Sequence, residues 1–238
     1  MSAGKPLAKA VATVALDWTD ACRLIPSRFP PVSLFDAVAQ PADLDVVFAI
    51  EALGNPRIRD EIGELSLVPA EQRISGPGTG PIMAAFTHLN PDGSRFSDGS
   101  YGVYYAAHDL ETAVAEVSHH RALFLACTQE PAIEIDLRCY RVRVKSKLCD
   151  LRGKQQGSEA ALYDPDSYVA SQAYGNARRA AGDAGIVFDS VRRPGGQCVA
   201  LFTPRATVPP ARQAEHVTLR WNGERMAEWY LKSEPQAL

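Results

Sequence analysis

The stretch 133–144 constrains the fold most, because its apolar and polar residues alternate as they do in a half-buried β-strand. In the first half every second residue is apolar, up to Leu137. From Tyr140 onward the alternation continues in the opposite phase, and a strand changes phase only at a bulge or a turn. The sequence therefore predicts two strand segments, 132–137 and 140–145, with an irregularity between them.

Other short apolar segments bounded by turn residues occur after about residue 70. They predict further strands at 82–87, 102–107, 186–189 and 197–202. A helix is predicted up to Ala126 with Asp109 as its N-cap, and a second one over 168–181. Asn222-Gly223 predicts a hairpin turn near the end of the chain. Because strands and helices mix without regular βαβ spacing, we expect an α+β fold.

The first 70 residues have a different character and predict a mainly helical segment punctuated by prolines. A helix over 41–53 is expected to end at Gly54, with Pro56 shortly after it, and a short helix is expected over 57–65. We therefore divide the chain into a helical N-terminal extension, 1–70, and a main domain of mixed strands and helices, 71–238.

Composition narrows the class of protein. The 238 residues are 46% hydrophobic and 22% charged, which is ordinary for a globular protein. A formal net charge of −3 gives no electrostatic reason to expect nucleic acid or an anionic membrane as a partner. The five scattered cysteines form no C-x-x-C pair, and neither a membrane span nor a signal peptide is expected. These features predict a soluble, cytoplasmic protein.

The segment 93–107 carries the clearest signs of a binding site. A polar, glycine-rich loop with Arg95 runs into a short apolar strand that contains Tyr104 and Tyr105. Glycine lets backbone approach a ligand closely, and arginine can fork onto phosphate oxygens. Neighbouring tyrosines on a strand face opposite ways, so one can be core while the other lines a pocket. A solvated loop remains the alternative interpretation of this segment.

Three more residues are candidates from their surroundings. Glu116 lies among small and apolar residues of the predicted helix, Arg73 precedes a glycine-rich run, and Ser190 ends a predicted strand. The run after Arg73 has no Gly-Lys-Ser/Thr ending, which argues against a Walker phosphate loop. An exposed glutamate and a turn-forming serine are the structural alternatives.

Two other chemistries have weaker support. Glu116, His119 and His120 could suggest a metal site, but an H-x-x-x-H spacing is missing and we expect no metal. Cys127 and Cys198 lie in apolar runs that suggest core rather than a cysteine nucleophile.

Taken in order, these segments resemble the RES family of toxins, which is named for an arginine, a glutamate and a serine. The resemblance covers about 71–203, and it depends on combination: Arg95 precedes Tyr105 by 10 positions and Glu116 follows Tyr105 by 11. It implies a fold similar to diphtheria-toxin-like ADP-ribosyltransferases, with mixed, split β-sheets and flanking helices. It also implies NAD as substrate and a cognate Xre-type antitoxin that blocks the site.

The resemblance places Glu116, Arg73 and Tyr105 in catalysis and Arg73, Arg95, Tyr105 and Ser190 in NAD binding. These residue types suit the reaction, because cleaving the nicotinamide–ribose bond creates an oxocarbenium-like ribose that a carboxylate stabilises. Arginines offset the diphosphate charge and an aromatic ring stacks on nicotinamide. Ser190 is expected to hydrogen-bond the nicotinamide amide or a phosphate.

The fate of ADP-ribose is left open by the sequence. We favour transfer to a protein, because a long N-terminal segment widens the surface available to an acceptor. Transfer to water or phosphate, which would degrade NAD, is the second hypothesis. A catalytically inactive module that binds a nucleotide or a partner is the third, although all five site positions hold chemically apt residues.

Overall fold

A computed structural model describes residues 11–29, 34–38, 40–54 and 62–233. Its secondary structure is a mixed sheet of seven strands with helices around it, so the predicted α+β class is confirmed. The sheet order is β1-β2-β5-β4-β3-β6-β7, with an additional pairing between β1 and β3. Among the described residues there is no helix long and apolar enough to cross a membrane.

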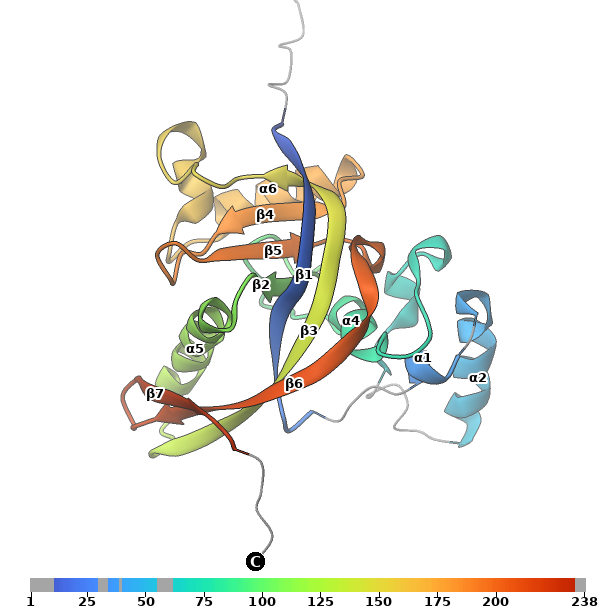
Figure 1. The fold of residues 1–238 in the computed structure, drawn as a ribbon, viewed down its shortest axis with the longest axis horizontal. Coiled ribbons are helices and arrows are strands. Elements are labelled where there is room, and N and C mark those ends of the chain that lie inside the picture. Colours follow the sequence, from blue (N-terminus) through green and yellow to red (C-terminus); the bar gives the residue numbers. More distant parts are fainter. Residues whose placement is uncertain (1–10, 30–33, 39, 55–61, 234–238) are drawn as a thin grey trace, which may run out of the picture.

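Two groups of strands make up this sheet, and they cross each other in Figure 1. The long group contains β1 (Thr13–Pro26), β3 (Ile133–Asp150), β6 (Thr207–Trp221) and β7 (Met226–Leu231). The short group contains β2 (Tyr104–Ala107), β5 (Gln197–Leu201) and β4 (Gly185–Asp189). The expected division of the strands into mixed, split sheets is therefore confirmed.

In the described part of the chain, two short junctions join the groups. At the first, β1 and β2 pair antiparallel through Cys22 and Ala107. At the second, the end of β3 pairs parallel with β4 at Cys149–Ile186 and Asp150–Val187. Beyond the first junction the edges of β1 and β2 are not paired with each other, which leaves a split between the two groups.

The prediction of a mainly helical 1–70 was wrong for Thr13–Pro26. This segment is strand β1, which pairs antiparallel with β3 along most of its length. Leu16 and Trp18 lie on its buried side, but an irregularity between Trp18 and Ala21 interrupts the alternation that would have predicted a strand. Thr13–Pro26 is therefore part of the central sheet, and not of a helical extension.

The helices after β1 are α1 (Leu34–Ala37) and α2 (Leu44–Gly54), and α2 agrees with the helix predicted over 41–53. Most of the short helix predicted over 57–65 falls outside the described residues. The strand predicted at 82–87 is wrong, since Gly80–Thr87 is helix α4 with Pro81 in its first turn. A short buried apolar run fits a strand or a helix equally well, and α4 is buried along most of its length.

The remaining predictions of secondary structure are confirmed. Helix α5 (Leu110–Ala126) begins at Asp109, whose side chain accepts a hydrogen bond of 2.8 Å from the Thr112 amide. Helix α6 is Val169–Ala180, and β6 and β7 form the hairpin at Asn222-Gly223. The two strands predicted within 132–145 are one strand, β3, whose pairing with β6 shifts register between Arg138 and Tyr140, as the change of phase predicts.

Candidate functional site

A cavity of about 1060 Å³ lies at the split between the two strand groups. Its walls include the unpaired edge of β1 from Arg23 to Pro26, the edge of β2 at Tyr105 and Ala106, and the loop 88–95. Helix α5, which contacts β1 and β2, contributes one face from Ala113 to Phe124. The volume is at the upper end of the range that small-molecule sites occupy.

Glu116 projects into this cavity from α5 and is held by a directed hydrogen bond. Its Oε1 accepts from the Ser190 hydroxyl at 2.6 Å. The Ser190 Oγ in turn accepts from the backbone amides of Arg192 at 3.1 Å and Arg193 at 2.9 Å. Because the two amides occupy its lone pairs, Ser190 directs its single proton at Glu116. The Cys198 thiol, which burial keeps protonated by raising its pKa, is 3.9 Å from the same carboxylate oxygen.

The turn that carries Ser190 is attached to α5 at a second place. Arg193 donates from Nη1 to Asp109 at 3.2 Å and to the Thr112 hydroxyl at 3.0 Å, both at the start of the helix. Gly196 packs so closely on Thr112 that an added Cβ would come within 2.5 Å of its hydroxyl. The β4–β5 turn therefore holds both the beginning of α5 and the carboxylate one turn further along.

Tyr105 lines the cavity from β2, and its hydroxyl organises the loop that carries Arg95. The Tyr105 oxygen accepts from the Phe96 amide at 2.9 Å and is hydrogen-bonded to the Ser94 hydroxyl at 2.9 Å. Burial raises the pKa of Tyr105, so the phenol stays protonated at neutral pH. Arg95 is thereby bracketed by two residues that bind one phenol.

Arg95 is buried, yet among the residues that the structure describes no carboxylate neutralises its charge. Its Nη1 donates to the carbonyls of Leu162 at 3.1 Å and Asp164 at 3.0 Å, and its guanidinium lies 4.6 Å from the centre of the Tyr168 ring. These contacts orient the side chain along the cavity wall while the positive charge remains available to an anion.

Arg73 is not brought together with these residues. Its Nε donates to Val68 at 2.8 Å, its Nη2 to Leu65 at 3.3 Å, and its Nη1 forms an ion pair of 2.8 Å with Asp45. All three nitrogens thus have partners in the neighbouring turns, and Arg73 is not among the residues that line the cavity. Ser190 also does not line it and reaches it only through Glu116.

A residue that the sequence analysis missed, Arg23, occupies the split itself. From β1 it donates from Nη1 to the carbonyl of Tyr105 at 3.0 Å, which bridges the two strand groups. Its guanidinium lies 4.8 Å from the centre of the Tyr104 ring, and its buried Nε has no hydrogen-bond partner in the described part of the chain. An arginine between the apolar residues Cys22 and Leu24 was the available signal, but it is informative only once β1 is known to be a strand.

The cavity carries an excess of positive charge. Four arginines line it, against the carboxylates of Glu116 and Asp92. Within the described ranges none of the four makes an ion pair. The four are Arg23, Arg95, Arg121 and Arg138. Such unneutralised charge in a partly desolvated site favours an anionic ligand.

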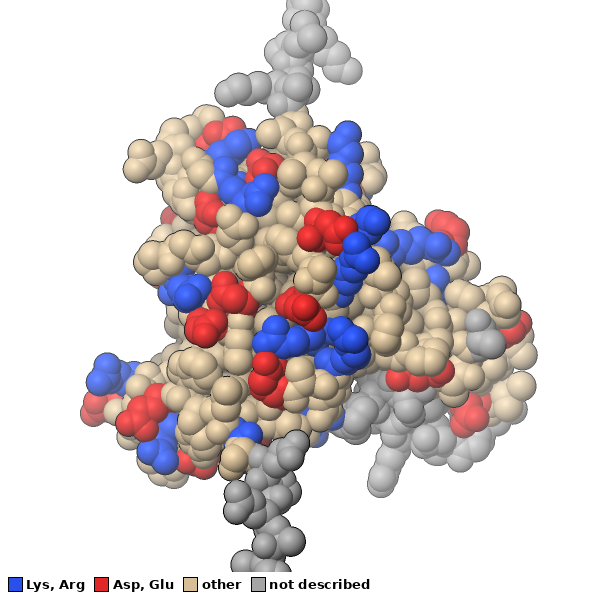
Figure 2. Space-filling model, viewed as in Figure 1, with Lys and Arg blue, Asp and Glu red and all other residues tan. Residues whose placement is uncertain are grey.

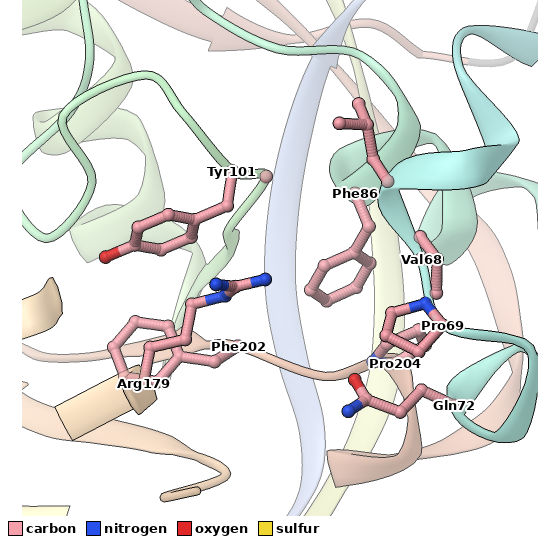
Figure 3. Close-up of a pocket in the computed structure, with 10 residues that line it drawn as sticks. Val68, Pro69, Gln72, Phe86, Tyr101, Arg179, Phe202 and Pro204 are labelled. Carbon is pink, nitrogen blue, oxygen red and sulfur yellow. The ribbon is translucent and has the colours of Figure 1, made fainter. Parts of the chain in front are cut away.

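Other parts of the molecule show weaker signs of a binding site. In the part of the chain that the structure describes, no three His, Cys, Asp or Glu side chains are placed to hold a metal. A second pocket, shown in Figure 3, lies between Tyr101, Phe86 and Pro204 and holds only about 10 Å³, which is about one water molecule. There the Arg179 guanidinium lies 4.4 Å from the centre of the Tyr101 ring. On the face seen in Figure 2, basic and acidic side chains are interspersed.

Fold and site together define an α+β protein whose split sheet surrounds a basic cavity with one hydrogen-bonded glutamate. Residues 70–222 match the RES domain, and the chain therefore belongs to the RES domain family. It is also 30% identical over 210 residues to the uncharacterized protein y4oC of Sinorhizobium fredii (strain NBRC 101917 / NGR234), covering 87% of this chain and 85% of that protein.

Among solved structures, the chain is similar to one from the crystal structure of the M. tuberculosis MbcT–MbcA toxin–antitoxin complex. The TM-score is 0.44 at 12% sequence identity, and the comparison covers 89% of this chain and 87% of that chain.

Proposed function

We propose that this protein cleaves the nicotinamide–ribose bond of NAD. The observation that carries the proposal is one cavity that contains a carboxylate oriented by a serine, together with four arginines that form no ion pair with any described residue. A dinucleotide diphosphate supplies the missing negative charge, and the carboxylate suits a reaction that creates positive charge on ribose. Membership of the RES domain family and the sequence resemblance to its toxins support the same assignment.

In this mechanism Arg23 and Arg95 bind the diphosphate on either side of Tyr105. The Tyr105 ring offers nicotinamide a stacking face. As the bond breaks, nicotinamide takes the bonding electron pair and leaves as a neutral ring, while Glu116 stabilises the oxocarbenium-like ribose. Ser190 orients the Glu116 carboxylate through its hydrogen bond. In this proposal that role takes the place of the direct contact with nicotinamide or phosphate expected from the sequence.

Arg73 has an indirect part in this proposal. Its bonds to Leu65, Val68 and Asp45 hold the turns that precede α4, and α4 contributes Pro81, Ala84 and Ala85 to the cavity wall. Its contribution is thus to the shape of the site.

For the fate of ADP-ribose we retain transfer to a protein acceptor as the leading hypothesis. The cavity continues to a rim where Leu123 and Phe124 are more than half exposed, which gives an acceptor a surface to contact. Transfer to water or phosphate, with net degradation of NAD, is the second hypothesis. We further propose that the chain is the toxin of a toxin–antitoxin system, with an Xre-type antitoxin covering the site.

An assay with NAD labelled in the adenylate half separates these hypotheses. The wild-type protein is incubated with a cell lysate, with and without phosphate. Label on a protein band means transfer, whereas free ADP-ribose or its phosphate means degradation. Nicotinamide is measured in the same samples. If none is released under any condition, the remaining hypothesis is the catalytically inactive binding module.

A further inference from the structure

The four arginines of the cavity fall into two pairs, and only one pair lies beside Tyr105. Arg23 bonds to the Tyr105 carbonyl, and Arg95 is in the loop that the Tyr105 hydroxyl holds. The second pair, Arg121 and Arg138, comes from the C-terminal half of α5 and from β3. A diphosphate requires one such pair, so the second pair has no assigned ligand.

Arg138 is the more constrained member of the second pair. It is 8% exposed, its Nη2 donates to the Phe29 carbonyl, and its buried Nε has no hydrogen-bond partner in the part of the chain described. A guanidinium that is this buried and has no carboxylate partner among the described residues is costly, and an anion in the cavity would offset its charge.

The segment Arg28-Phe29 connects the two arginines. Phe29 accepts the bond from Arg138. Burial, and to a smaller extent the positive charge of the nearby Arg28, lowers the pKa of Arg121. Along the axis of α5, Arg121 is about 8 Å from Glu116, since each residue adds about 1.5 Å. Arg121 thus lies further along the same cavity wall than Glu116, on the side toward which the other half of a dinucleotide could extend.

We propose that Arg121 and Arg138 form a second anion subsite, which binds a single phosphate group, either esterified or free. The identity of the ligand rests on the proposed function: a dinucleotide whose nicotinamide end lies at Glu116 would bring its adenosine ribose toward this pair. The phosphate is then the 2′-phosphate of a phosphorylated dinucleotide, or free inorganic phosphate bound in the same place. Exposed rings of Phe29 and Phe124 at this end provide stacking faces for a base.

The test is a calorimetric titration that needs no catalysis. Adenosine 2′,5′-bisphosphate, adenosine 5′-monophosphate and inorganic phosphate are titrated into the wild-type protein, Arg121→Gln and Arg138→Gln. Arg143→Gln is the matched control, because Arg143 is ion-paired to Asp17 outside the cavity. Thermal unfolding shows whether each variant is folded. If Arg138→Gln, which alters a buried residue, does not fold, the result with Arg121→Gln alone tests the subsite.

We expect the wild-type protein to bind the bisphosphate about tenfold or more tightly than the monophosphate, as charge-assisted hydrogen bonds imply. Arg121→Gln should reduce this preference to about threefold or less and leave monophosphate affinity unchanged. Phosphate binding that depends on Arg121, without a preference for the bisphosphate, supports the subsite with free phosphate as its ligand. The subsite would be overturned if the wild-type protein bound the bisphosphate and the monophosphate equally tightly and if Arg121→Gln did not change the binding of inorganic phosphate. Absence of nicotinamide release with the preference intact would reject the proposed function and not the subsite.

Discussion

Strand β3 carries arginines in two different settings. Arg141 and Arg143 point away from the cavity, and each is ion-paired across the sheet, to Glu215 at 2.6 Å and to Asp17 at 2.6 Å. Arg138, on the same strand, lines the cavity and has no carboxylate partner among the described residues. The same residue type thus occurs in two settings on one strand. Where it is paired outside the cavity it contributes modestly to stability, and where it has no carboxylate partner its charge stays unneutralised, as the proposed function requires.

Outside the cavity arginines are found in both settings. Arg152 with Asp150 and Arg220 with Glu134 have local carboxylates, whereas others such as Arg179, Arg192 and Arg205 contact a ring or backbone carbonyls. All four cavity arginines instead use backbone carbonyls, aromatic rings or no described partner. Carbonyls and rings orient a guanidinium without cancelling its charge, which is the arrangement a preorganised anion site requires.

The largest effect should come from Glu116. Glu116→Gln removes the negative charge that stabilises the ribose cation and should lower the rate of nicotinamide release by about a thousandfold. NAD binding, measured by calorimetry, should change by less than about threefold, because the amide keeps the shape of the side chain. Release at the wild-type rate would contradict the role given to Glu116.

Replacing one arginine inside the cavity and one outside it tests the comparison between ion-paired and unpaired arginines. Arg95→Ala should weaken NAD binding by about tenfold to a hundredfold, since it removes charge-assisted bonds to the diphosphate. Arg143→Ala, which breaks the ion pair with Asp17, should leave NAD affinity unchanged. Similar losses in both variants would mean that net charge, and not the cavity, determines affinity.

Ser190 should have a smaller effect, confined to the chemical step. Ser190→Ala frees Glu116 from its hydrogen bond and should lower kcat about tenfold with little change in KM. Ser190→Thr keeps the hydroxyl and should recover most of the rate. A rise in KM with kcat preserved would instead indicate that Ser190 touches NAD.

The smallest effect concerns pH and His119. Burial, with the nearby charges of Arg192 and His120, lowers the pKa of His119, and its buried Nε2 lacks a hydrogen-bond partner in the described residues. The unfolded chain therefore binds a proton more readily, so the free energy of unfolding should fall as pH drops through the ordinary value of 6.5. Chemical denaturation between about pH 8 and pH 5 should show that the free energy of unfolding of His119→Gln falls less steeply with decreasing pH than that of the wild type. An unchanged slope would contradict the assignment.

How far the sequence predicts the site depends on how local each signal is. Asp109 caps a helix through a contact three residues away, so the position of Glu116 on α5 follows from the sequence. Tyr105 and Arg95 are joined through a loop and a strand that are adjacent in the chain, and they too were predicted. These contacts span few residues, and their residue types have strong local preferences.

The missed features depend on contacts between distant segments. Arg23 becomes a site residue only because β1 pairs with β3, more than a hundred positions later, and this pairing leaves no local signature beyond an interrupted alternation. The bond from Ser190 to Glu116 likewise joins residues 74 positions apart. Arg73 shows the reverse case, since a position beside a glycine-rich run does not determine which way its side chain points.

The most direct test of the account is a single-turnover measurement of nicotinamide release from NAD by the wild-type protein, Glu116→Gln and Arg143→Gln side by side. We expect release by the wild type and by Arg143→Gln at similar rates, and almost none by Glu116→Gln although it still binds NAD. Equal release by all three proteins, or none by the wild type, would contradict the claim that this cavity cleaves NAD.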